Sequence, residues 1–209
     1  MVLKFEPITC GDRTAIRSSV DVIAAGVDLF LPDLGRPFHA YAAAGPEDDH
    51  EGTRAADAIA RVRQGMKAML RLGSAWYDVA EQIKAVTECG IDPRHVILCT
   101  DDSHSGTLVE EGHMDRVVRH AIQQGLKPIT AIQMATLNTA EHFKLERDLG
   151  SIAPGRRAAF LIVSDLAALT IDEVYARGVH LASKGKLVAD IAPHDYPARA
   201  KNTVNMLRD

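Results

Sequence analysis

The hydrophobic pattern changes most sharply at residues 95–104, where the apolar run HVILC ends in the polar run TDDSH. The apolar run is short, aliphatic and β-branched, and it follows a turn at residues 91–94, which predicts a buried strand. Asp101, Asp102 and His104 come directly after it. Parallel sheets place their chemistry at the carboxyl ends of strands. A carboxylate buried there is costly unless a cation such as a metal ion compensates its charge, so this segment is the first candidate for a functional site.

Helical and strand patterns alternate on both sides of this run, as in α/β proteins. Amphipathic spacing, turn residues and short apolar runs indicate where each element lies. The predicted elements are strands at 2–5 and 27–31, a helix at 39–44, a helix from a Thr53 cap to about Met69 that overlaps a short strand within 66–74, a helix at 78–89, the strand at 95–99, and helices at 110–124 and 128–143. The second half of the last helix has an alternative start at an Asn138 cap.

The pattern of residues changes after Leu149, where Gly and Pro turn residues precede a continuous apolar strand at 158–163. Residues 173–188 have the pattern of a hairpin, with Lys184-Gly185-Lys186 between its strands. We therefore place a boundary near residue 146. Residues 1–145 form an α/β part, and residues 146–209 form a small β domain and linker.

Composition narrows the class of protein. Apolar residues make up 46% and charged residues 25% of the 209 residues, which is typical of a soluble globular protein. The net charge of −4 gives no sign of nucleic-acid or anionic-membrane binding, and no run reaches membrane-spanning length. Three cysteines and the absence of a signal-peptide pattern favour a reducing cytoplasm. Nine histidines slightly raise the expectation of a metal site.

Three polar clusters carry candidate chemistry, and each has a structural alternative. Residues 48–51, DDHE, are either a site facing the strand ends or a solvated acidic loop. Residues 101–104, DDSH, are either a site or a capping turn after the strand. Residues 110–113, EEGH, are best explained as the start of a helix, where acidic side chains are favourable. The chain has no serine-hydrolase elbow and no phosphate-binding glycine loop, which argues against serine hydrolases and nucleotide-dependent enzymes.

Taken in order, several motifs resemble the adenine deaminase branch of the amidohydrolase superfamily. They are HAYAAAGPEDDHEGTRAADAIARVRQGMKAMLRLGSA, then ILCTDDSHSGTLVEEGHMDRVVRHAIQQGLKPITAIQMATLNTAEHFKL, then DLGSIAPGRRAAFLIV and DYPARAKNTV. The resemblance covers roughly residues 38–205, and its specificity comes from separate motifs in the right order. It implies an α/β fold, a partial (β/α)8 TIM barrel of the metal-dependent hydrolase type followed by a small β unit.

The resemblance also implies roles for four residues. His50 matches a metal-binding histidine, and Asp101 matches the aspartate that binds metal and handles the proton of the attacking water. Asp102 and His104 match nearby positions that face the substrate or support the ligands. The implied cofactor is a divalent transition metal, Fe, Mn or Zn, in a centre that is binuclear in the intact family fold. The implied reaction is hydrolysis of a purine base, adenine and water giving hypoxanthine and ammonia, with metal-activated water.

The chain also departs from the family pattern. It has no HxH pair, no clear match to the bridging acidic ligand, and no GHAP-type histidine before residue 38. The turn before the β unit reads Arg157-Ala158-Ala159, where the family usually has an aspartate after Arg-Ala. The chain therefore resembles only the last part of the barrel. Three or four strands cannot close a barrel, so its edges require a homo-oligomer or a complementing chain.

Two functions from different classes remain at this point. The first is an adenine deaminase-like hydrolase whose substrate is a small purine base, without nucleic-acid or membrane partners. The alternative is a catalytically inactive amidohydrolase fragment that acts as a structural or interaction module and needs a partner chain. The missing HxH pair favours the alternative. Metal content and ammonia release from adenine distinguish the two.

Overall fold

A parallel sheet of three strands organises the first part of the protein. The computed structural model describes residues 35–201, so the strands predicted at 2–5 and 27–31 lie outside the described residues. Strands β1 (Asp48–Asp49), β2 (Lys67–Arg71) and β3 (Val96–Cys99) pair in the order β1-β2-β3. All pairs are parallel, so the three carboxyl ends meet at one edge of the sheet.

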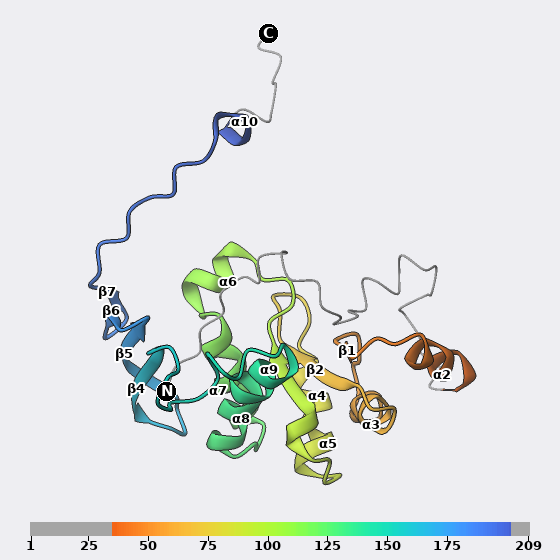
Figure 1. Cartoon of the computed structure of the whole chain (residues 1–209). Coiled ribbons are helices and arrows are strands. Elements are labelled where there is room, and N and C mark those ends of the chain that lie inside the picture. Colours follow the sequence, from red (N-terminus) through yellow and green to blue (C-terminus); the bar gives the residue numbers. More distant parts are fainter. Residues whose placement is uncertain (1–34, 202–209) are drawn as a thin grey trace.

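Helices connect these strands, and a second sheet follows them (Figure 1). The remaining elements are α2 (Arg36–Ala43), α3 (Ala55–Arg63), α4 (Val79–Gln82), α5 (Lys84–Thr87), the 3₁₀ helix η1 (Pro93–His95), α6 (Ser105–Glu110), α7 (Met114–Gln123), α8 (Pro128–Ala135), α9 (Leu137–His142), β4 (Phe160–Asp165), β5 (Thr170–Ala176), β6 (Val179–Ser183), β7 (Lys186–Leu187) and α10 (Ala198–Lys201). None of these described helices is long and apolar enough to cross a membrane.

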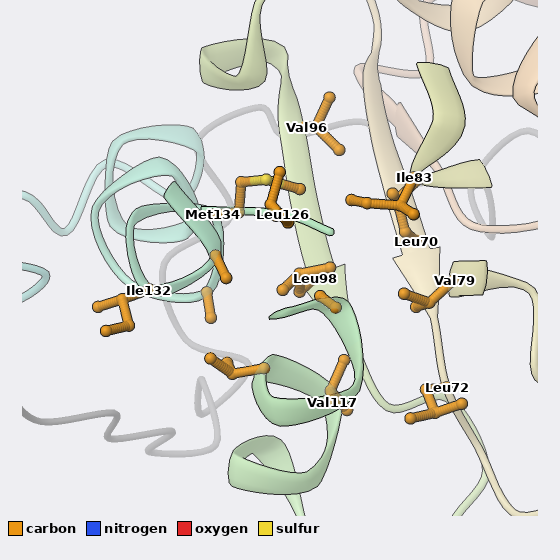
Figure 2. Close-up of a cluster of buried hydrophobic side chains, with 14 of the residues drawn as sticks. Leu70, Leu72, Val79, Ile83, Val96, Leu98, Val117, Leu126, Ile132 and Met134 are labelled. Atoms are coloured by element: carbon orange, nitrogen blue, oxygen red, sulfur yellow. The ribbon is translucent and has the colours of Figure 1, made fainter. Parts of the chain in front are cut away.

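The main core lies between the three-stranded sheet and its helices. Leu70 of β2 and Leu98 of β3 are fully buried, and they pack with Val79, Ile83 and Val117 from the helical segments, as Figure 2 shows. Side chains alternate between the two faces of a strand. The helices therefore cover the face that carries Leu70 and Leu98, and neighbouring residues of these strands point to the other face.

The second sheet is an antiparallel meander of β4, β5, β6 and β7. The turns Arg177–Gly178 and Lys184–Gly185 separate its last strands, so the predicted hairpin has three strands rather than two. The turn before β5 joins this sheet to the helices. Leu169 is buried in the main core, and the carbonyl of Ala168 accepts a hydrogen bond from Arg119 Nε of α7 at 3.3 Å.

The strand expected at 95–99 is confirmed as β3, and β2 confirms the strand within 66–74. Three long helices predicted from amphipathic spacing are wrong in extent. The helix expected to reach Met69 ends at Arg63, and those at 78–89 and 110–124 are each interrupted. Residues 128–143 form two helices, as in the alternative with a separate second helix, which begins at Leu137. Gly112 causes one of the splits, because its φ of +105° is incompatible with a continuous helix.

Both predicted helix caps differ from the structure. Arg54, rather than Thr53, is the N-cap of α3, and the Asp57 carboxylate accepts hydrogen bonds from both backbone N–H groups. Asn138 lies inside α9 instead of capping it. Its amide donates to the carbonyls of Pro93 and Val96 at 2.7 and 2.8 Å, and it fastens α9 to the start of β3. A tertiary contact has therefore overridden the local capping preference.

Replacing Leu98 with alanine should destabilise the fold strongly. The side chain is fully buried in the main core, and its truncation leaves a cavity between β3 and the helices. We expect the free energy of unfolding to fall by about 2–5 kcal/mol, measured by urea denaturation. Ile162→Ala is the control, since Ile162 is 48% exposed on β4, and it should change stability by only about 0.5 kcal/mol. Equal effects of the two variants would contradict this assignment of the core.

Candidate functional site

The carboxyl edge of the parallel sheet gathers charged side chains from three loops. His50 and Glu51 follow β1, Arg71 is the last residue of β2, and Asp101 lies just after β3. Arg71 follows Leu70, which packs against the helices, so the arginine points to the opposite face of the sheet. The parallel order of the strands brings together residues that are up to 51 positions apart, as between His50 and Asp101.

Arg71 joins these loops through a buried network of ion pairs. Its Nη1 donates to Glu51 Oε2 and to Asp101 Oδ2, both at 2.9 Å. Its Nε donates to Asp78 Oδ2, also at 2.9 Å. The guanidinium therefore contacts one carboxylate from each of the three loops, at the carboxyl ends of β1, β2 and β3. Such charge-assisted hydrogen bonds are stronger than neutral ones.

The surroundings of Arg71 keep it charged. Burial alone would lower its pKa, but the hydrogen bond to Asp78 and the charges of Glu51 and Asp101 outweigh burial and raise the pKa above its ordinary value. The Trp76 ring covers the guanidinium, with 4.9 Å between the ring centroid and Cζ. Burial also raises the pKa of the nearby Cys99 thiol to about 12, so this cysteine is not a reactive thiolate.

The loops after β2 and β3 are tied together through Ser74. Its N–H donates to the Asp102 carbonyl at 3.0 Å, and its hydroxyl accepts from the His104 N–H at 2.7 Å and bonds Thr107 Oγ1 at 2.8 Å. Gly73 permits this approach, because a Cβ at that position would lie 2.7 Å from the Asp102 carbonyl oxygen. The two loops therefore hold Asp101 in a fixed frame.

The loop after β1 is fixed in a similar way. The buried Gln82 side chain of α4 donates to the Gly52 carbonyl at 2.6 Å. Asp49 is buried and pairs with Arg61 of α3 at 3.2 Å, and Asp48 pairs with His142 of α9 at 2.8 Å. The segment 48–51 is therefore not the solvated acidic loop of the structural alternative, since its two aspartates are buried and partnered.

The four predicted site residues have different environments. Asp101 has a left-handed backbone with φ of +59°, and its carboxylate bonds Arg71. The His50 side chain is 35% exposed, and its Nε2 lies 3.4 Å from Glu51 Oε1. Glu51 and Arg71 therefore connect His50 to Asp101. Asp102 is exposed and contacts Ser74 through its backbone, whereas His104 is the exposed N-cap of α6, where Nδ1 accepts from a backbone N–H.

The third cluster, residues 110–113, precedes a helix as its pattern indicates, with His113 as the N-cap of α7, but its two glutamates do not lie in the first turn of that helix. Glu110 ends α6, and Glu111 lies in the connection to α7, where Oε2 is 2.7 Å from Arg116 Nε. Arg116 also donates to the carbonyls of Leu72 and Gly73, so it helps to hold the loop after β2. This cluster therefore supports the loop and contributes no group to the Arg71 network.

Sequence reasoning missed Arg71, Glu51 and Asp78. Arg71 ends an apolar run and opens the motif RLGS, which is the signal that would have found it. An arginine at the end of a buried strand needs partners for its charge, and acidic residues after neighbouring strands can supply them. The order of the strands has to be known before the partners can be chosen.

The described residues do not by themselves fit a metal ion. The donor types are suitable, because imidazole and carboxylate bind transition metals. However, Arg71 already engages one oxygen each of Glu51 and Asp101. Within residues 35–201, no group of three or more His, Cys, Asp or Glu side chains is placed to hold a metal. A metal centre would need ligands from outside this range.

A comparison of sequence families agrees with the order of the motifs. The pattern of the Amidohydrolase family matches residues 49–188, more than half of the chain, and the protein belongs to this family. The chain is 82% identical over 202 residues to an adenine deaminase of Mesorhizobium japonicum, with 96% of this chain and 33% of that protein covered. It is 66% identical to adenine deaminase 3 of Rhizobium meliloti, over 98% of this chain and 35% of that protein.

A more distant relative gives the same result. The adenine deaminase of Rubrobacter xylanophilus is 47% identical over 213 residues, with 98% of this chain and 35% of that protein covered. The resemblance to the adenine deaminase branch is therefore confirmed. The chain spans about a third of the length of these curated relatives.

Solved structures agree on the fold. A β-aspartyl dipeptidase of Fervidobacterium islandicum AW-1 superposes with a TM-score of 0.56 at 19% identity, covering 73% of this chain and 46% of that one. An N-acetyl-D-glucosamine-6-phosphate deacetylase of Mycobacterium smegmatis gives a TM-score of 0.54 at 18% identity, covering 70% and 44%. At this identity the likeness shows only the shared fold, which mixes helices and strands as predicted.

Removing the Ser74 hydroxyl should loosen the two loops. Ser74→Ala loses the contacts with the His104 N–H and Thr107 Oγ1, and we expect the free energy of unfolding to fall by about 1–2 kcal/mol in urea denaturation. Ser103→Ala is a matched control, because the Ser103 hydroxyl makes only a 3.4 Å contact with the Asp101 carbonyl. The control should be close to wild type. An unchanged Ser74→Ala variant would show that these bonds do not hold the loops.

Proposed function

We propose that this chain is the part of an adenine deaminase-like hydrolase that carries the last strands of a TIM barrel. In this proposal residues 1–145 belong to the barrel and residues 146–209 form a small β domain and linker. The observation that carries the proposal is the identity of 47–82% to proteins named adenine deaminase, over 96–98% of this chain. The parallel order of β1, β2 and β3 agrees with it, because barrel strands are parallel.

The proposed reaction converts adenine and water to hypoxanthine and ammonia. Asp101 is the proposed catalytic residue: its carboxylate accepts a proton from the attacking water and delivers it to the leaving amino nitrogen. Asp102 and His104 are proposed to contact the base or to support the ligands. His50 and Asp101 are proposed ligands for a divalent transition metal, Fe, Mn or Zn. The other ligands, and any second ion, depend on residues outside the described part of the chain.

The anchoring of Asp101 supports its proposed role. Its backbone is held in the left-handed region, which aspartate tolerates better than most residues, and one carboxylate oxygen is fixed by Arg71. Positioned groups accelerate proton transfer more than mobile ones. The neighbouring Asp102 carbonyl is fixed by Ser74, so the whole turn after β3 is restrained.

A second function has specific support. In the alternative, the chain is an inactive amidohydrolase fragment that works as an interaction module with a complementing chain or with further copies of itself. The pairing of Asp101 with Arg71 favours this alternative, because it leaves His50 and Asp101 as too few ligands for a metal centre. A stable, metal-free assembly that releases no ammonia from adenine is the expected behaviour.

A chimera tests the proposed function directly. The matching third of the Mesorhizobium japonicum relative is replaced by this chain, and ammonia release from adenine is measured. At 82% identity the replacement should fold, and we expect activity within about tenfold of the parent. Asp101→Asn in the chimera should lower the rate by at least about 10²-fold, because the proton carrier is lost.

Asp92→Asn is the control for that substitution. Asp92 is an acidic residue in the turn before β3, and it pairs with Arg94 on the surface, away from the carboxyl edge. It should leave ammonia release unchanged. An active chimera in which Asp101→Asn has no more effect than Asp92→Asn would exclude the catalytic role of Asp101. A folded chimera without activity would favour the interaction module.

A further inference from the structure

The three carboxylates at the carboxyl edge of the sheet share one positively charged partner, the Arg71 guanidinium. Glu51, Asp78 and Asp101 each place one oxygen 2.9 Å from a nitrogen of the same guanidinium. The Arg71 side chain is 6% exposed, and the three carboxylates are 16–17% exposed. Charges removed from water to this degree must be compensated locally. The positive charge that such a cluster requires is supplied by the protein itself.

Arg71 is also fixed in orientation. Its Nε is held by Asp78, its Nη1 by Glu51 and Asp101, and the Trp76 ring lies 4.9 Å from Cζ. A guanidinium is planar and permanently charged, so these contacts on its edge and its face define one position. Moving it out of the cluster would break all of them together.

A divalent ion and this guanidinium compete for the same oxygens. A transition metal binds a carboxylate oxygen at about 2.0–2.2 Å. An ion at that distance from Asp101 Oδ2 would stand beside Nη1, which is itself 2.9 Å from the same oxygen. Two like charges at such a separation repel strongly in a buried site. A divalent ion therefore binds Glu51 Oε2 and Asp101 Oδ2 more favourably once the guanidinium has left them.

We propose that Arg71 is the resident cation of this cluster, and that in this chain its guanidinium takes the place of a divalent ion at Glu51 and Asp101. A metal then binds these carboxylates only after Arg71 leaves them. This inference concerns the chain by itself: in the proposed hydrolase, Asp101 would bind the metal only after Arg71 had left its carboxylate. It does not require deaminase activity, because its readouts are metal binding and stability, so ammonia release from the chimera can fail without affecting it.

Trp76 provides a local signal for the test. It is the single tryptophan of the 209 residues, and it stacks on Arg71. Co²⁺ is the probe, because it binds nitrogen and oxygen ligands and quenches nearby tryptophan emission. The wild-type chain and Arg71→Met are each titrated with Co²⁺. Binding is followed by visible absorption and Trp76 emission, and melting temperature is followed by circular dichroism.

The expected results are opposite for the two proteins. The wild-type chain should take up no stoichiometric Co²⁺, and its melting temperature should not change with the ion. Arg71→Met leaves three carboxylates without a cation, so it should melt lower. It should bind one Co²⁺ at least about tenfold more tightly than wild type, with quenched Trp76 emission and a partly restored melting temperature. Adding Asp101→Asn to Arg71→Met should remove the tight binding.

Two matched variants separate this role from general destabilisation. Arg71→Lys keeps a positive charge at the cluster and should resemble wild type in Co²⁺ binding. Arg61→Met removes another buried arginine, which is 3.2 Å from the single carboxylate of Asp49. It should melt lower as well. Co²⁺ should not restore its melting temperature, because the loss of Arg61 leaves only one carboxylate unpaired, whereas the loss of Arg71 leaves three that can bind a cation together.

Stoichiometric Co²⁺ uptake by the wild-type chain would overturn the proposal, since Arg71 would then not take the place of the ion. A folded Arg71→Met protein that binds Co²⁺ no more tightly than wild type would also overturn it. If Arg71→Met fails to fold with and without Co²⁺, the wild-type titration decides. Stoichiometric uptake of Co²⁺ by the wild-type chain then refutes the resident cation.

Discussion

A buried guanidinium has to be surrounded by negative charge, and this requirement shapes the carboxyl edge of the sheet. Arg71 meets it with Glu51, Asp78 and Asp101, one carboxylate from each loop at that edge. None of the three loops can move away without leaving a charge unpaired in a poorly solvated position, which is expensive. The network therefore links the loops energetically as well as spatially.

The remaining contacts of the edge strengthen the same linkage. Ser74 connects the second loop to the third, and Gln82 connects α4 to the loop after β1. The apolar core beneath them, which contains Leu70 and Leu98, packs the helices on the sheet whose strand order these contacts depend on (Figure 2). The strand order thus determines which charges meet, and the charges determine how the loops are held.

The sequence predicted the parts of this fold that depend on local pattern. A continuous apolar run identified β3, and Gly and Pro residues identified most of the turns. Helix extent was less predictable, because Met69 fits a helical stripe but pairs in β2 instead. Periodicity alone does not distinguish a helix end from the strand that follows it.

The site was predictable in part for a related reason. Asp101 and His50 stand next to strand ends and match a family pattern, so the sequence points to them as candidates. Arg71 was not among them, because a buried arginine is identified by partners that come from three separate segments. Asn138 is a similar case: its local preference is to cap a helix, but in the fold its amide finds two carbonyls more than 40 positions away.

That contact of Asn138 has a consequence for how the sheet can grow. The Cys99 carbonyl accepts from Leu72 on the β2 side, and carbonyls three residues apart in a strand point to opposite sides, so Val96 turns its carbonyl to the outer edge of β3. The Asn138 amide occupies that carbonyl at 2.8 Å. A strand added at this edge must displace the amide or begin its ladder beyond Val96. Helix α9 thereby covers part of the outer edge of β3, which discourages pairing with unrelated strands.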